Sequence, residues 1–194
     1  MREGMPSLRT RPRLLRFLIQ SLGAPSALAW IDGTRTFQAD VANRQDLLNG
    51  LNRFCSGMRE APEVPVFLHI TAHGNALGIQ AGSEFVGWSE MKPYIAALND
   101  ACGGRLVLCM SSCEGVSALV MALSQGKPPF QAIVGAEDSI GIGVNANWHS
   151  FYGRISGGDG LEAAFASLQA ECKEHQERFF MLTAAELQPQ VSLQ

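Results

Sequence analysis

Short, almost unbroken apolar runs punctuate the chain at residues 64–71, 106–110 and 131–135. Each run is followed by small, polar or glycine residues that favour turns. A short apolar run bounded by turn residues is typical of a strand that is buried on both faces of a parallel sheet. We therefore predict three buried strands in these positions.

Apolar residues at helical spacing fill most of the sequence between and after these runs. Asn43 is a predicted N-cap, and Pro93 fits the first turn of a second helix. The predicted apolar helical faces are Leu47, Leu48, Leu51 and Phe54; Met91, Ile95, Leu98 and Cys102; Val116, Leu119, Val120 and Leu123; Trp148, Phe151, Tyr152 and Ile155; and Leu161, Phe165, Leu168 and Cys172. Strands that alternate with helices in this way predict an α/β fold, a three-layer α/β/α sandwich with a mostly parallel central sheet.

Two hairpins and a final strand complete the predicted elements. Asp32-Gly33 separates residues 26–31 from 34–39, and a turn at 81–83 separates 77–80 from 84–88. The last strand is predicted at 178–183. Apolar residues near the N-terminus, at 15, 18, 19 and 22, have helical spacing. We accordingly assign residues 1–25 to a basic N-terminal segment with a helix, 26–187 to a single domain and 188–194 to a tail.

Composition and charge narrow the classes of function. The 194 residues are 46% hydrophobic and 17% charged, which suits one domain with a sizeable core, and the net charge of −3 argues against general nucleic-acid binding. No apolar run is long enough for a transmembrane segment. The five cysteines are odd in number and form no CxxC pair, so we expect reduced thiols in a cytoplasmic protein, with no metal site.

Two residues that carry chemistry follow the first two predicted strands. His73 lies just after the first strand, and Cys113 lies just after the second, before a helical pattern. Parallel strands that are neighbours would present both side chains at one edge of the sheet, where ligands bind in open α/β sheets. A thiol acts as a nucleophile when a base and a helix N-terminus favour its thiolate form. The alternatives, which this placement makes the weaker interpretations, are a buried structural thiol for Cys113 and a turn histidine for His73.

The ordered set of features resembles the caspase-like cysteine peptidases (clan CD), in particular their bacterial CHAT-domain branch. An apolar block precedes His73-Gly74, and another precedes Cys113, as in that superfamily. Further matches to the CHAT branch are Ser112-Cys113-Glu114 in place of Ala-Cys-Glu, the hairpin at 77–88, Val134-Gly135, and Phe151-Tyr152. The resemblance covers roughly residues 28–185. It implies a caspase-like sandwich and a thiol protease that needs no cofactor.

The resemblance also implies roles for individual residues. Cys113 is the expected nucleophile and His73 the general acid and base, while the N–H groups of Gly74 and Cys113 form the oxyanion hole. Glu114 stabilises the dipole of the following helix or binds substrate. Glu137 and Asp138, which follow the third strand, are candidate substrate-binding carboxylates that would favour a basic P1 residue. Ser111 stands where caspases have Gln and metacaspases Asp, so neither cleavage preference carries over.

The expected function is therefore a cysteine endopeptidase that cleaves protein or peptide substrates, as members of this superfamily do in bacterial regulated proteolysis, cell death and antiphage defence. Members of the CHAT branch can be activated by a partner protein. Two alternatives stay open from the sequence. One is a catalytically inactive caspase-like scaffold, and the other is a different thiol hydrolase or an acyltransferase.

Overall fold

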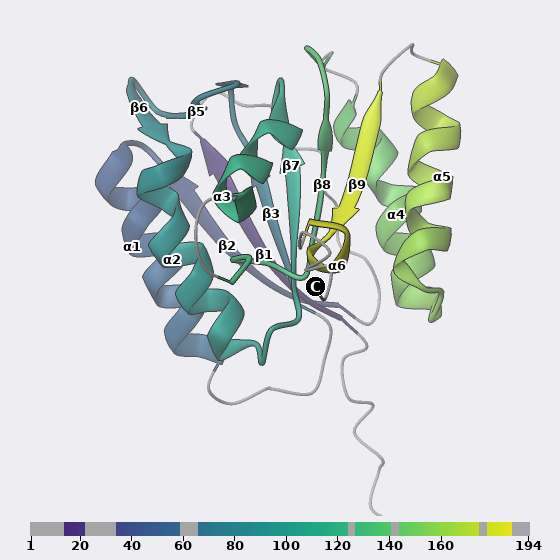
Figure 1. The fold of residues 1–194 in the computed structure, drawn as a ribbon, viewed down its shortest axis with the longest axis horizontal. Coiled ribbons are helices and arrows are strands. Elements are labelled where there is room, and N and C mark those ends of the chain that lie inside the picture. The colour runs from purple at the N-terminus through teal and green to yellow at the C-terminus, as the bar shows by residue number, and fades with distance from the viewer. Residues whose placement is uncertain are drawn as a thin grey trace, which may run out of the picture.

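A central sheet forms the middle layer of the molecule (Figure 1). The structure, a computed structural model, describes residues 14–21, 34–58, 66–123, 127–140, 144–174 and 178–187. Within them the sheet has six strands in the order β2-β1-β3-β7-β8-β9. Their bounds are Leu14–Ser21 for β1, Thr34–Val41 for β2, Val66–Thr71 for β3, Leu106–Ser111 for β7, Ala132–Ala136 for β8 and Phe179–Thr183 for β9. All neighbours are parallel except β8 and β9, which are antiparallel.

Helices cover both faces of this sheet and complete the three layers. On one face the core contains residues of α1 (Arg44–Gly57), α2 (Trp88–Ala101), the 3₁₀ helix η2 (Gly115–Leu119) and α3 (Val120–Leu123). On the other face it contains residues of α4 (Val144–Gly157) and α5 (Leu161–Glu174). The short α6 (Ala184–Leu187) follows β9. The prediction of an α/β/α sandwich with a mostly parallel sheet is confirmed.

The predicted patterns explain how these elements form. β3 and β7 are buried along their whole length because helices cover both of their faces. Side chains alternate between the faces, so Leu68 packs in the core of α1 and α2, whereas Phe67 packs in that of α4 and α5. At the start of α1 the side chain of Asn43 accepts a 2.9 Å hydrogen bond from the N–H of Asp46, which confirms the predicted N-cap.

The prediction of a helix near the N-terminus was wrong. Leu14–Ser21 is the strand β1, which lies between β2 and β3 and is parallel to both. A mostly apolar run suits an inner strand of a sheet as well as a helix, and pairing with a strand on each edge decides the outcome. The central sheet therefore begins before residue 26.

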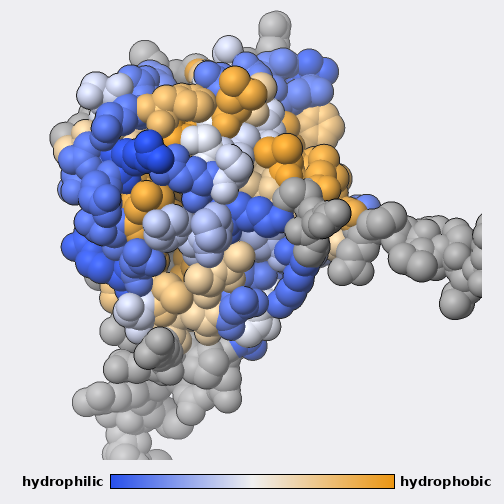
Figure 2. Space-filling model, turned by 60° about the vertical axis from the view of Figure 1, so that its left-hand side comes forward, coloured by the Kyte–Doolittle hydropathy of each residue, from blue (hydrophilic) through white to orange (hydrophobic). Residues whose placement is uncertain are grey.

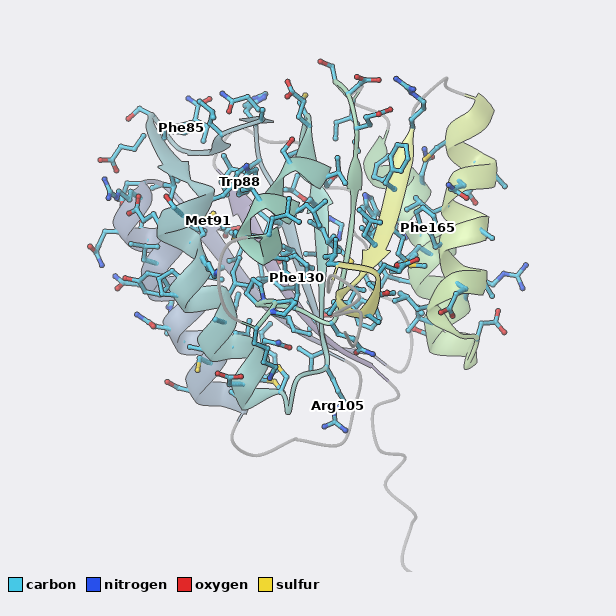
Figure 3. All side chains as sticks on the ribbon, in the orientation of Figure 1. Phe85, Trp88, Met91, Arg105, Phe130 and Phe165 are labelled. Atoms are coloured by element: carbon cyan, nitrogen blue, oxygen red, sulfur yellow. The ribbon has the colours of Figure 1, made fainter. Side chains whose placement is uncertain are left out.

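The hairpin at 77–88 is confirmed as part of a second, three-stranded antiparallel sheet. Its strands are β4 (Gly74–Asn75), β5 (Gly78–Ala81) and β6 (Glu84–Gly87). The indole N–H of Trp88 donates to the carbonyl of Ala76 over 3.0 Å, which ties the hairpin to the start of α2. Figure 3 shows Trp88 and Met91 directed from α2 toward the sheet, while Phe85 lies at the outer end of the hairpin.

The tip of this hairpin is tied to the loop between β2 and α1. Gly82, at its tip, has a φ of 62°, and a methyl group on it would lie 1.8 Å from the carbonyl oxygen of Ala42. The backbone N–H of Arg44 donates to the carboxylate of Glu84 over 2.9 Å. The hairpin therefore bridges the loop after β3 and the loop between β2 and α1.

The remaining predictions concern the first hairpin, the C-terminal tail, the cysteines and membrane-spanning helices. In the first predicted hairpin, residues 26–33 lie outside the described residues, and the second arm is β2, which pairs in parallel with β1. The tail at 188–194 also lies outside them. All five cysteines are free thiols. Among the helices of the described ranges, none has the length and apolar character needed to cross a membrane.

Candidate functional site

His73 and Cys113 follow two neighbouring parallel strands in the same register. Thr71, the last residue of β3, is the partner of Ser111, the last residue of β7. His73 and Cys113 each come two residues later. In Figure 3 Arg105, just before β7, lies at the end of the sheet opposite to Phe85 of the hairpin. The structure thus brings both predicted catalytic residues to the carboxyl edge of the sheet, beside the hairpin.

The backbone around His73 joins the two sheets. The N–H of Ala72 donates to the carbonyl of Ser111 over 3.3 Å, so the chain follows β7 one step beyond the strand. The carbonyl of His73 then accepts a 2.8 Å hydrogen bond from the N–H of Gln80 in β5. The side chain of His73 is exposed. Its backbone is fixed on both sides while its imidazole can reach a substrate.

A tight turn presents Cys113 at the edge of the sheet. The N–H of Gly115 donates to the carbonyl of Ser112 over 3.1 Å and closes the turn, with Cys113 and Glu114 at its corners. Glu114 has a φ of 51° and a ψ of 29°, a left-handed conformation that is unusual for a residue with a side chain. Cys113 is half-buried. The turn therefore places a half-buried thiol directly after the end of the buried strand β7.

The helical segment after Cys113 differs in kind from the predicted one. We expected a helix N-terminus at the thiol, but a 3₁₀ helix of five residues begins at Gly115 and continues into an α-helix of four residues. The left-handed Glu114 precedes it, so the regular N–H groups start two residues beyond the cysteine. So short a helical segment aligns few peptide dipoles, and therefore favours a thiolate less than the predicted helix would.

Gly74 packs directly against the cysteine turn. A methyl group on Gly74 would lie 3.0 Å from the carbonyl oxygen of Cys113, so only glycine allows this approach without a shift. The bond between His73 and Gln80 makes these residues a hydrogen-bonded pair. The next pair, Gly74 and Ile79, is therefore a non-hydrogen-bonded pair, and the N–H of Gly74 points away from β5. That orientation suits the predicted role of Gly74 as a donor to an oxyanion.

Gly135 of β8 supports the same turn from the other side. A methyl group on Gly135 would lie 2.7 Å from the backbone nitrogen of Val116 and 2.8 Å from the carbonyl carbon of Gly115. These are backbone atoms, which cannot rotate away as a side chain can. The glycine at the end of the third strand therefore lets the cysteine turn lie flat against the sheet.

The predicted substrate-binding carboxylates lie near this turn, and two of them form ion pairs with an arginine of this chain. The N–H of Glu114 donates to the carbonyl of Asp138 over 3.0 Å, and Glu114 and Glu137 are half-buried. The guanidinium of Arg178 lies 2.7 Å from the carboxylate of Asp138 and 3.0 Å from that of Glu137. The hydrogen bond with Asp138, followed by the charge of Glu137, raises the pKa of Arg178. A substrate cation would thus compete with Arg178 for both carboxylates.

His69 and Cys109 belong to the core, as the sequence predicted. They are partners in the register of β3 and β7 and are fully buried. Nδ1 of His69 lies 2.8 Å from the hydroxyl of Tyr152, and the ring packs edge-on against Trp148 with a centroid distance of 4.6 Å. Trp88 and Trp148 are buried as well. These residues hold the sheet against α4 and α2 rather than reach the edge that carries Cys113.

Sequence reasoning missed two residues at this edge. Arg178 was predicted only as the start of a strand, because the antiparallel direction of β9, which places Arg178 beside Glu137, leaves no mark in the sequence. Ser112 was noted only as a match to the alanine of the CHAT branch. Its environment depends on Gly74, which is distant in the sequence.

Exposed apolar side chains occur close to the site. Leu77 and Phe85 of the hairpin are 73% and 47% exposed, and Val120 and Leu123 of α3 are 49% and 65% exposed. Figure 2 shows hydrophobic residues in separate groups among hydrophilic ones on this side of the molecule. In the described ranges no three His, Cys, Asp or Glu side chains are grouped so that they could hold a metal ion.

No protein-family model matches this chain, and no curated protein is significantly similar to it in sequence.

Proposed function

We propose that this protein is a cysteine endopeptidase with a dyad of Cys113 and His73. The observation that carries the proposal is the register of β3 and β7, in which Thr71 pairs with Ser111 and the two reactive residues follow at equal distance. A half-buried thiol on a tight turn and an exposed imidazole on the adjacent loop are the two groups that acyl transfer requires. The resemblance to the caspase-like peptidases points to the same pair.

The reaction proceeds through a thioester. His73 accepts the proton of the Cys113 thiol, and the sulfur attacks the carbonyl carbon of the scissile peptide bond. The N–H groups of Gly74 and Cys113 stabilise the negative oxygen of the tetrahedral intermediate, and each such donor contributes about 10²–10³ to kcat. The C–N bond breaks as His73 donates its proton to the leaving amine. Water, deprotonated by His73, then hydrolyses the thioester and releases the free thiol.

The resemblance also suggests the setting of the reaction. The substrate is a protein, the process is regulated proteolysis, cell death or antiphage defence in bacteria, and a partner protein activates the enzyme. The left-handed Glu114 is consistent with a functional turn, because strained backbone conformations concentrate at active sites. Glu114 and the pair of Glu137 and Asp138 remain the proposed substrate-binding carboxylates.

Cleavage of a diverse peptide library, with products identified by mass spectrometry, tests the proposal. We expect wild type and Cys55→Ala to cleave the same peptides and Cys113→Ala to cleave none. Cys55 is the matched control because it is a partly exposed thiol on α1, away from the site. Cleavage by Cys113→Ala would exclude the dyad. Hydrolysis or transfer of small thioesters without peptide cleavage would instead favour a different thiol enzyme, and an unreactive Cys113 would favour a scaffold.

A further inference from the structure

Ser112, the residue before the proposed nucleophile, has an unusual environment. Its side chain is buried, with 1% of its surface exposed. Within the described residues its hydroxyl oxygen has no hydrogen-bond partner. A hydroxyl that is buried without a hydrogen-bond partner destabilises the folded state. Hydrogen bonding therefore does not explain why a serine is found at position 112.

The surroundings of Ser112 show what its side chain does contact. It fills a narrow slot between Gly74 on the histidine side and Gly115 on the cysteine side. A methyl group on Gly74 would lie 3.1 Å from Cβ and 3.2 Å from Oγ of Ser112, and a methyl group on Gly115 would lie 3.0 Å from the same Oγ. Ordinary contacts between carbon atoms are about 3.5–4.0 Å. The slot therefore accepts a serine side chain and has no room for another carbon on either wall.

We infer that Ser112 is a positioning residue that sets the spacing between His73 and Cys113. This inference rests on the proposed function. His73 is adjacent to one wall of the slot, and Cys113 lies between Ser112 and the other wall. The side chain of Ser112 is buried, and protein interiors hold few voids as large as a methyl group, so a larger group at 112 must displace the atoms packed around it. A displacement of about 1 Å between reacting groups can lower a rate about 10²-fold. The short side chain at 112 is thus part of the geometry of the dyad.

The test compares substitutions of different size at one position. Ser112→Thr adds a methyl group to the slot, Ser112→Ala removes only the unpartnered hydroxyl, and Ser89→Thr makes the same change at an exposed position of α2. The measured quantity is the rate at which iodoacetamide alkylates Cys113, followed for the Cys113 peptide by mass spectrometry from pH 5 to 10. Thermal unfolding of each variant accompanies the measurement.

We expect Ser112→Thr to lower the alkylation rate at pH 7 by about 10-fold or more and to change how that rate depends on pH. Ser112→Ala and Ser89→Thr should keep the wild-type profile. A wild-type profile in a folded Ser112→Thr would overturn the positioning role alone. If wild-type Cys113 already behaves as an ordinary thiol, there is no activated dyad, and both this inference and the proposed peptidase are wrong.

If Ser112→Thr does not fold, a second pair of variants tests the same inference. Gly74→Ala narrows the slot from the opposite wall, and Ser112→Gly in the same chain removes two of the three close contacts that the new methyl group makes. We expect Gly74→Ala to slow alkylation of Cys113 and the double variant to recover most of the loss. Equal rates for the single and the double variant would contradict the inference.

Discussion

Gly135→Ala is expected to destabilise the protein and displace the turn that carries Cys113. The new methyl group would lie 2.7 and 2.8 Å from backbone atoms of Val116 and Gly115. Normal contacts are about 3.5–4.0 Å, so η2 must move by roughly 1 Å. Overpacking of this kind costs about 1–3 kcal/mol, and the lower entropy of the unfolded alanine chain returns about 0.4–1 kcal/mol. Central values of about 2 and about 0.7 kcal/mol for these two effects leave a net loss of about 1.3 kcal/mol.

Thermal unfolding and urea denaturation both measure this loss. For a chain of this size, 1 kcal/mol corresponds to about 2–4 °C, so we expect Tm to fall by about 3–5 °C. Alkylation of Cys113 should change in the same variant, because η2 continues directly from its turn.

The matched control is the same substitution at Gly153. This residue is exposed on α4, and a methyl group on it would have no atom within 4 Å. Alanine favours a helix over glycine by about 0.5–1 kcal/mol, so Gly153→Ala should raise Tm. If Gly135→Ala proved as stable as wild type, the close packing of β8 against the cysteine turn would be refuted.

Two further predictions concern other parts of the molecule. Burial raises the pKa of the Cys102 thiol to about 12, above its value in the unfolded chain, so the folded state binds the proton more tightly. The contribution of this thiol to the free energy of unfolding is complete below about pH 9. From there toward pH 12 that contribution falls by up to about 1.4 kcal/mol per pH unit. Urea denaturation at pH 8 and pH 10.5 should show the stability difference between wild type and Cys102→Ala narrowing, and a constant difference would contradict this. Arg178→Ala frees the carboxylates of Glu137 and Asp138, so, if they bind substrate, the peptide library should show more Arg and Lys at P1. An unchanged P1 distribution would assign those carboxylates to the turn alone.

The sequence predicted those elements whose hydrophobic pattern fits only one kind of secondary structure at their place in the fold. The runs before His73 and Cys113 became neighbouring parallel strands because continuous apolar character fits a strand that is buried on both faces. The helix capped by Asn43 and the hairpin around Gly82 followed from local chemistry in the same way. β1 failed because a run such as Leu14–Ser21 fits either element, and its choice depends on pairing with both β2 and β3.

In the candidate site, too, features set by neighbouring residues in the sequence were predicted, whereas features set by contacts between distant segments were not. Residues after the two strands were predicted because the edge of a parallel sheet collects them. The slot around Ser112 was not predictable, since its walls come from Gly74 and Gly115 and only their approach in space defines it. The partner of Glu137 and Asp138 was missed because it depends on the direction of β9.

The proposed dyad draws on both sheets of the molecule. Cys113 follows a central strand of the large sheet, whereas the carbonyl of His73 is held by the small sheet through Gln80. Small peripheral sheets open at lower free energy than central strands, as native-state hydrogen exchange reveals in other proteins. A brief opening of the hairpin would separate base from nucleophile while the rest of the fold stays intact. We therefore expect the activity of the proposed peptidase to be lost in denaturant before any signal of global unfolding appears.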